Sequence, residues 1–526
     1  MKIKLTLSLI IIFGIIITGC KQQEQKVEVE EVKIDLVNDE FPEAKQEVME
    51  TFGAIAQSIK DGEIDKLVKG LLGDTPIEED LKELCDVIGG RPTGSIANIL
   101  SIDWGLEKFQ KAGVSVSKEA FTMPGLWLEN ESSAKISGAA EFDPRVVALT
   151  FSKGTHRTGL RGNLVDGGHG TMDDFARLGD NAKGNFVLIE TDELLDIDGL
   201  FKEYADAVLI EDLAYKEGVK GLVYMSSRPM RLLYRHNASR SFENSLPMVV
   251  MAREDAKRCL RILRNDKSLS LLVKINIREG GPYKSYNVIG EIKGSERPDE
   301  VVIIGAHLDS WGLGTGANDN GCNVAMMIDI ARQMIKLDIK PKRTIRFALW
   351  NGEELGLYGS MAYTEKYESQ LNNHVMAMSV DIGSGPITGF FTGGRPDVLD
   401  ATNKIMDSLT DLGMFTNIDI PLVGTDNFDF MMHGVGNLIA NHEPANYAPN
   451  YHAESDTYDK VNLQALKHNS AIVAAVTLRY ANDLNIDIPR QSRQDIEKLV
   501  ESTDLEQQMK SMMGIWYQWI DGKRGR

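Results

Sequence analysis

Cysteine and positive charge are both scarce in this sequence. Its 526 residues include four cysteines, and Cys85, Cys259 and Cys322 form an odd set without CxxC spacing, which argues against a disulfide framework and a cysteine zinc site. The 77 acidic residues outnumber the 58 basic ones, giving a formal net charge of −19. Because this charge repels the phosphate backbone, we expect no nucleic-acid partner.

Two widespread catalytic motifs are also missing. The sequence contains no G-x-S-x-G nucleophile elbow and no H-E-x-x-H motif, which argues against a serine hydrolase and against that zincin pattern. Apolar residues, in contrast, are plentiful: 42% of the chain is hydrophobic and 26% is charged. A chain of this length and composition can bury a sizeable core in about two domains.

The first twenty residues, MKIKLTLSLIIIFGIIITGC, predict a lipoprotein signal peptide. Lys2 and Lys4 precede an unbroken apolar run that ends in ITGC, a pattern that resembles the bacterial lipobox. We expect Cys20 to carry lipid and to hold an exported protein at a membrane of the cell envelope, on its periplasmic or outer face. The alternative is an uncleaved membrane anchor, for which the run is short. Residues 21–40 are polar and charged, and predict a flexible tether.

Periodicity divides the rest of the chain into an α/β domain with an insertion. Residues 95–112 have apolar residues at helical spacing, which with a following strand opens a βα pattern within residues 41–125. Short strand-like pieces and glycine-rich turns then fill residues 126–282, which we interpret as an inserted, mostly-β domain. The βα alternation resumes over residues 283–489, so we predict a layered α/β sheet.

The tail, residues 490–526, has apolar residues roughly on one helical face. We expect this face to pack on its own domain or on a second copy in a homodimer, with contact to a membrane as the alternative. The residues are Leu499, Leu505, Met509, Met512 and Trp516.

Potential metal ligands follow three apolar segments that read as buried strands. VVIIGA runs into His307 and a loop with Asp319, TIRFALW is followed by Asn-Gly and then Glu353 and Glu354, and HVMAMSV ends at Asp381. A single acid at a strand end is commonly a cap or a surface charge. Three such ends together favour a shared site, because ligands bind outside the carboxyl ends of strands in open α/β sheets.

A fourth segment, NYHAESDTYDKV, adds His452, with Asp456 four residues later. Neutral imidazole combined with carboxylates suits zinc, and nearby acids orient such histidines by accepting the second ring proton. We therefore predict that Asp309 supports His307 and that Asp456 is a supporting carboxylate beside His452.

The motifs together resemble the di-zinc exopeptidase family, which includes bacterial aminopeptidases and plasma glutamate carboxypeptidase. The matching strings are GAHLDSWGLGTGANDNG, LWNGEELGLYGS, SVDIGSG and YHAESDTYDKV, in this order, with GGRPTGS near the N-terminus. The resemblance spans about residues 80–485. It implies a mixed sheet sandwiched by helices, and the insertion is similar to a protease-associated (PA) domain.

The resemblance also implies a role for each ligand position. Asp319 would bridge two Zn²⁺ ions, His307 and Asp381 would complete one site, and Glu354 and His452 the other. Glu353 would be the general base, taking a proton from the attacking water and returning it to the leaving amine.

The implied activity is hydrolysis of the end residue from peptides or of dipeptides, of the aminopeptidase type. A carboxypeptidase or dipeptidase stays open because the motifs do not fix the specificity pocket, and a non-catalytic binding protein on this scaffold is the alternative of another class. Tyr234, Arg235 and His236 are candidate substrate contacts, although we favour surface loop residues there; for Tyr447 and Tyr451 a role in polarising the substrate carbonyl and aromatic packing are equal explanations.

Overall fold

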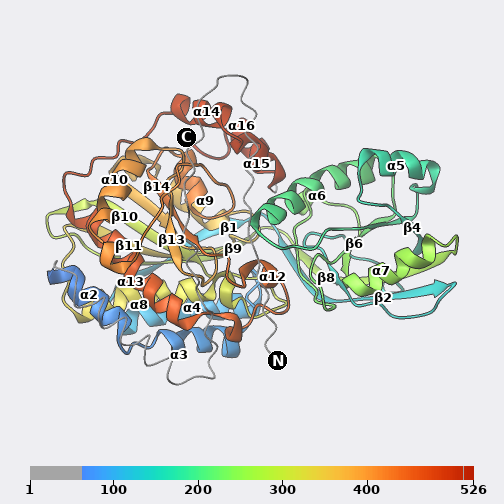
Figure 1. Cartoon of the computed structure of the whole chain (residues 1–526), viewed down its shortest axis with the longest axis horizontal. Helices are drawn as coiled ribbons and strands as arrows, with labels where there is room; N and C mark the ends of the chain where they lie inside the picture. The colour runs from blue at the N-terminus through green and yellow to red at the C-terminus, as the bar shows by residue number, and fades with distance from the viewer. Residues whose placement is uncertain (1–61, 513) are drawn as a thin grey trace, which may run out of the picture. The chain divides into compact units, whose positions relative to one another are not determined.

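A computed structural model describes residues 62–512 and 514–526 (Figure 1). The predicted signal peptide, the lipidated Cys20 and the tether lie outside the described residues. Two seven-stranded sheets form the framework of the described part. The first sheet belongs to the α/β domain and the second is confined to the insertion, between Leu126 and Gly280.

The first sheet is mixed and has a parallel centre. Its strand order is β1-β9-β11-β10-β12-β14-β13, in which β11, β10, β12 and β14 run parallel while β1, β9 and β13 pair antiparallel. Apolar side chains of β10 alternate between two cores: Val302 and Ile304 pack on one face, Val301 and Ile303 on the other. Because both faces are covered, the strand reads as a continuous apolar run. The strands are β1 (Ser115–Met123), β9 (Tyr283–Ile292), β10 (Arg297–His307), β11 (Arg343–Trp350), β12 (His374–Ser379), β13 (Ile387–Phe391) and β14 (Asn437–His442).

Helices cover both faces of this sheet (Figure 1). The helix predicted over residues 95–112 is present as α4, with Ser95 as its N-cap. The larger core lies between the sheet and α2 (Gly62–Leu72), α3 (Ile77–Lys82), α4 (Ile96–Lys111), α8 (Cys322–Lys336), α10 (Pro396–Asp407) and α13 (Leu463–Asn482). The other face packs against α9 (Tyr358–Lys366) and α11 (Asn427–Met432), and α12 (Tyr447–Asn450) lies in the loop that precedes His452.

The insertion forms the second sheet, with strand order β2-β8-β4-β5-β6-β7-β3. It is more helical than the predicted mostly-β domain, because the parallel neighbours β4, β5 and β6 are joined through helices and a further helix follows β7. The chain enters and leaves between paired strands, since Met123 pairs with Tyr283 and Leu126 with Gly280. The elements are β2 (Leu126–Gly138), β3 (Val146–Ala148), β4 (Leu160–Asp166), α5 (Met172–Leu178), β5 (Phe186–Ile189), α6 (Ile197–Glu217), β6 (Gly221–Met225), β7 (Met248–Met251), α7 (Arg253–Leu263) and β8 (Leu269–Gly280).

The tail forms three short helices that pack on the α/β domain: α14 (Arg493–Ser502), α15 (Leu505–Ser511) and α16 (Ile515–Ile520). Leu505 and Met509 are buried in a cluster with Phe428 of α11. The buried guanidinium of Arg524 pairs with Asp429, its Nε and Nη2 lying 2.7 and 2.8 Å from the two carboxylate oxygens. The apolar face of the tail is therefore used within the chain, as the first of its predicted alternatives states.

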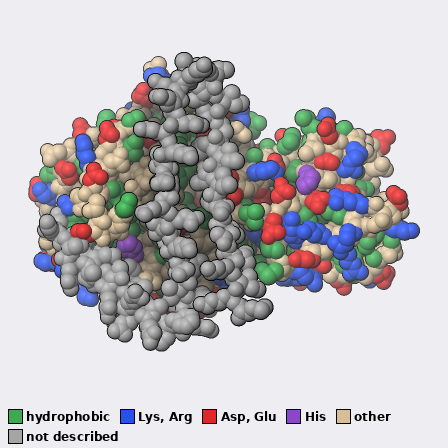
Figure 2. Space-filling model, viewed as in Figure 1, with side chains coloured by type: hydrophobic (Ala, Val, Ile, Leu, Met, Phe, Trp, Pro, Cys, Tyr) green, Lys and Arg blue, Asp and Glu red, His purple; other side chains and the backbone are tan. Residues whose placement is uncertain are grey.

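Within the part of the chain that the structure describes, every helix is too short or too polar to cross a bilayer. Figure 2 shows acidic and basic side chains interspersed over the visible face, rather than gathered into one patch of a single sign.

Candidate metal centre

The parallel strands bring the predicted ligands to one edge of the first sheet. His307 is the last residue of β10, Glu353 and Glu354 lie in the loop after β11, and Asp381 comes two residues after β12. Because β10 pairs in parallel with both β11 and β12, these three strand ends point the same way.

Five side chains form two groups that share Asp319. The first group is His307, Asp319 and Asp381, and the second is Asp319, Glu354 and His452. Within each group, the candidate ligand atoms lie within 4.8 Å of one another. His307 Nε2 is 3.1 Å from Asp319 Oδ1 and 2.9 Å from Asp381 Oδ1. His452 Nε2 is 3.2 Å from both Asp319 Oδ2 and Glu354 Oε2.

The electrostatics of this cluster favour a bound cation. Burial raises the pKa of Glu353 and Glu354 well above the usual range, and nearby carboxylates raise it further. Burial likewise raises the pKa of Asp381 to about 6. Glu354 Oε1 is buried and accepts no hydrogen bond. Buried, crowded carboxylate oxygens are costly unless a positive charge compensates them, so the donor set fits a divalent metal.

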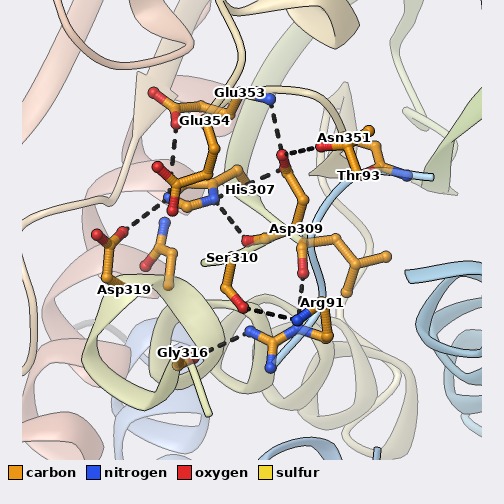
Figure 3. A network of polar contacts seen from close by, with 12 residues as sticks. Arg91, Thr93, His307, Asp309, Ser310, Gly316, Asp319, Asn351, Glu353 and Glu354 are labelled. Atoms are coloured by element: carbon orange, nitrogen blue, oxygen red, sulfur yellow. Dashed lines mark hydrogen bonds and ion pairs between the residues drawn. The ribbon is translucent and has the colours of Figure 1, made fainter. Parts of the chain in front are cut away.

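Asp309 lies beside His307, but the oxygen that faces the ring belongs to its main chain and not to the predicted carboxylate. His307 Nδ1 lies 2.9 Å from the main-chain oxygen of Asp309 and 3.8 Å from its carboxylate. The carboxylate instead accepts hydrogen bonds from the Thr93 hydroxyl at 2.6 Å and from the Glu353 N–H at 3.3 Å (Figure 3). Asp309 thus fixes His307 through its backbone and the Glu353 loop through its side chain.

Asp456 lies near the bridging position rather than beside the His452 ring. Its two carboxylate oxygens accept the main-chain N–H groups of Asn318 and Asp319, at 2.8 and 3.1 Å. The predicted place beside His452 is therefore wrong, and the residue that Asp456 positions is Asp319.

Arg91 is a supporting residue that sequence reasoning missed. Its fully buried guanidinium donates to the carbonyl oxygens of Leu308, Thr315 and Gly316, at 2.8, 2.7 and 2.9 Å. These contacts hold both ends of the loop between His307 and Asp319, and Figure 3 shows the one to Gly316. The GGRPTGS string contains this arginine, and the string was the only signal available.

The insertion contacts the candidate ligands Glu354 and His452 directly. Arg235 N–H donates to the His452 carbonyl at 2.9 Å, and His452 Nδ1 lies 3.2 Å from the Arg235 carbonyl. Asn237 Nδ2 donates to the main-chain oxygen of Glu354 at 2.8 Å. A bridge between Tyr234 and Ala453 completes the contact. The segment 234–237 therefore fixes the ring of one ligand and the backbone of another.

The predicted substrate contacts mostly have protein partners. The Tyr234 hydroxyl donates to Glu203, the Arg235 guanidinium pairs with Glu129 at 2.5 Å, and the Tyr447 hydroxyl donates to the Asp381 carbonyl at 3.4 Å. Tyr451 stacks on His452, with ring centroids 3.6 Å apart. His236 Nδ1 accepts the Asn237 N–H at 2.9 Å, whereas His236 Nε2 and Arg235 Nε are buried without a hydrogen-bond partner.

Glu353 belongs to neither ligand group, although it lies beside both. Its Oε2 is 4.0 Å from His307 Nε2, and the residue is buried. A carboxyl group with a raised pKa, next to a metal site but outside the ligand set, is suited to moving a proton during the reaction.

Comparisons with known proteins agree with this geometry. Residues 287–477 match the model of peptidase family M28. Carboxypeptidase Q from Xenopus laevis is 27% identical over 410 residues, which are 77% of this chain and 84% of that protein. A peptidase M28 precursor from Shewanella amazonensis SB2B is 27% identical, with a TM-score of 0.72 over 85% of this chain and 99% of that one. A zinc aminopeptidase from Bacillus subtilis shares the fold, with a TM-score of 0.60, 21% identity and coverage of 79% of this chain and 96% of that one. The predicted α/β fold is confirmed.

Proposed function

We propose that this chain, a metallo-exopeptidase with a peptidase family M28 domain, acts as an aminopeptidase. It would remove the end residue of peptides or split dipeptides. The observation that carries the proposal is the pair of buried ligand groups that share Asp319. A shared carboxylate with a histidine and a further acid on each side is suited to a dinuclear centre.

Two Zn²⁺ ions fit the donors, which are imidazole nitrogens and carboxylate oxygens. His307 and Asp381 would hold one ion, Glu354 and His452 the other, with Asp319 between them. When bound, such a pair of ions lowers the pKa of a water and stabilises the negative charge that develops on the substrate carbonyl.

Glu353 would take a proton from the attacking water and deliver it to the amine nitrogen as the peptide bond breaks. Asp309 holds the backbone of Glu353, and through its own carbonyl it holds the His307 ring. Asp309 thus positions both the base, Glu353, and the ligand His307. This keeps the proton acceptor at a set position relative to the metal site.

A carboxypeptidase or dipeptidase is the second candidate, because the relative named carboxypeptidase Q aligns over most of its own length. The intact ligand set and Glu353 favour either enzyme over a binding protein on the same scaffold. Location and assembly are proposals from the sequence: an exported protein, lipid-anchored through Cys20, that acts on peptides and pairs as a homodimer.

A chelator and readdition assay tests the function. Dipeptides, N-blocked peptides and C-amidated peptides are compared before and after metal removal and after zinc is restored. An aminopeptidase cleaves C-amidated but not N-blocked substrates, and a carboxypeptidase does the reverse. Full activity in the metal-free protein would contradict the proposal.

A further inference from the structure

The backbone of His452 adopts a conformation that its surroundings have to hold. Its φ is 55°, in the left-handed region, which is unfavourable for a residue with a Cβ atom. Such a conformation persists where neighbouring groups fix the chain on both sides of it. The contacts made by the carbonyl oxygens of Tyr451 and His452 therefore decide where the imidazole points.

Two donors from the insertion bind these consecutive carbonyl oxygens. Arg228 Nη2 donates to the Tyr451 carbonyl at 2.9 Å, and the Arg235 N–H donates to the His452 carbonyl at 2.9 Å. The second donor belongs to the main chain, so any residue except proline can supply it at position 235. The first donor is a side chain, so this contact depends on the arginine at position 228.

The Arg228 guanidinium is itself fixed within the insertion. The residue is fully buried, and its Nη1 donates to Ser227 Oγ at 2.5 Å and lies 3.5 Å from a carboxylate oxygen of Glu203. The guanidinium also lies 4.1 Å from the centroid of the Tyr234 ring. A buried ion pair contributes little net stability, because desolvation offsets the attraction. A planar guanidinium held on several sides does, however, present its remaining donor at a set position.

Tyr451 connects this donor to the metal centre. Its ring stacks on the His452 ring, with centroids 3.6 Å apart and planes inclined by 23°. Its hydroxyl lies 3.1 Å from the hydroxyl of Tyr204 in α6. The insertion therefore holds Tyr451 at its carbonyl and at its hydroxyl. Trp311 also packs against the imidazole, with centroids 4.9 Å apart.

We propose that Arg228 is a positioning residue for the metal centre, which holds the Tyr451 carbonyl and so keeps the His452 ring turned toward the other ligands. Those ligands are Asp319 and Glu354, each with a carboxylate oxygen 3.2 Å from His452 Nε2. The inference rests on the metal centre of the proposed function, and it adds a buried charge of the insertion as a determinant of one metal site.

The test removes the whole ion pair. Loss of Arg228 alone would leave the largely buried Glu203 carboxylate without its counter-ion and would destabilise the fold. The variant to measure therefore carries both Arg228→Met and Glu203→Gln. Methionine has a long side chain without charge, and the glutamine oxygen can still accept the hydrogen bond that Ser227 donates at 2.8 Å.

Arg253→Met is the matched control. Arg253 is also a buried arginine of the insertion, and its Nη1 donates to two main-chain oxygens, those of Thr191 and Ser226, at 3.0 and 3.1 Å. Both acceptors belong to the insertion, whereas the acceptor of Arg228 belongs to the loop that carries a metal ligand. The comparison thus separates loss of a buried guanidinium from loss of the contact to Tyr451.

Stepwise chelator competition on the zinc-loaded proteins measures the affinity of each ion, and thermal unfolding shows that the variants are folded. We expect the double variant to bind one ion about tenfold more weakly and the other as wild type does. The control should bind both ions as wild type does. Two unchanged affinities in a folded double variant would overturn the proposal. Equal weakening of both ions would also overturn it, because the effect would then not be confined to the site of His452.

Arg228→Lys is the conservative variant, and it covers a double variant that does not fold. Lysine keeps the charge beside Glu203 but lacks the rigid fork of donors. We expect the same ion to bind several-fold more weakly. Wild-type affinity for both ions would show that Arg228 only neutralises Glu203, which contradicts the positioning role. Wild type that binds two ions but hydrolyses no peptide would overturn the proposed function alone, because the affinities test Arg228 without turnover.

Discussion

The two sides of the metal centre are built in different ways. His307 and Asp381 follow neighbouring strands of one sheet, and the partners that fix His307 belong to the same domain. Glu354 and His452 lie in loops that are held by segment 234–237 of the insertion. One side therefore depends on the α/β domain alone, whereas the other also depends on the insertion. The insertion is a structural part of the centre.

The largest effect is expected where both sides meet. Asp319→Ala removes the shared ligand, so we expect metal content to fall on both sides and turnover to disappear. Elemental analysis of the dialysed protein measures the first and dipeptide hydrolysis the second. Asp338→Ala, an exposed aspartate after α8, is the control. Retention of two ions by Asp319→Ala would show that the sides do not share a ligand.

Glu353→Gln is expected to abolish most turnover while both metal sites stay occupied. The amide cannot accept the proton of the water, and a positioned base contributes about 10²–10⁴-fold. Kinetics and metal content are measured on the same preparation. Near-wild-type activity would refute the role of Glu353, and loss of metal would place it among the ligands.

Asn237→Ala tests the side held by the insertion. It removes the hydrogen bond to the Glu354 carbonyl, and changes around ligands typically lower metal affinity about 10–100-fold. Stepwise chelator competition should show one ion weakened and the other unchanged. Equal weakening of both ions would mean that the two sides are not independent.

Thr93→Val is the counterpart on the sheet side. It removes the hydroxyl that donates to Asp309, which in turn fixes His307 through its backbone. Because Thr93 is one contact further from the ligand than Asn237, the loss of affinity should be below about tenfold and confined to the other ion. The same competition assay compares the two variants, and weakening of the same ion in both would contradict the assignment.

The smallest expected effect is the pH dependence of stability that arises from Glu211, a buried residue of the insertion. Burial raises the pKa of Glu211 from 4.5 to about 7, although Ser239 donates hydrogen bonds to its carboxylate; Arg240 and Asp212 are the nearby charges. Since the folded state binds this proton more tightly, its contribution to stability is full below about pH 4.5 and is lost as the pH rises to about 7.

Glu211→Gln should remove this dependence. The difference in melting temperature between wild type and variant is measured from pH 4.5 to 8, and it should change by a few degrees across that range and then become constant. A difference that does not vary with pH would show that Glu211 titrates as an exposed glutamate.

The sequence predicted the sheet side better than the insertion side. Buried strands such as VVIIGA and TIRFALW have a continuous apolar pattern because both faces of the sheet are covered, and each polar residue at the strand end then stands out. The motifs at these ends also led to the exopeptidase family, a prediction that the comparisons confirm.

Contacts between distant segments could not be read in the same way. Arg91 lies 217 residues from Leu308, and Arg235 lies 217 residues from His452. Helix α6 was missed because its apolar residues serve two clusters, Leu200 and Tyr204 in one and Ile210 and Ala214 in another, so no single stripe marks it. Asp456 was placed beside the nearest histidine in sequence, whereas the fold directs it to Asp319.

The pairing of Arg524 with Asp429 matters to anyone who wishes to trim this enzyme. Arg524 also donates to the Gly356 carbonyl at 3.1 Å, in the loop that carries Glu353 and Glu354. A fragment that stops at residue 489 would leave the Asp429 carboxylate buried without its counter-ion, at a cost of about 3–5 kcal/mol. The smallest working version of the catalyst therefore includes the three terminal helices, even though none of them supplies a ligand.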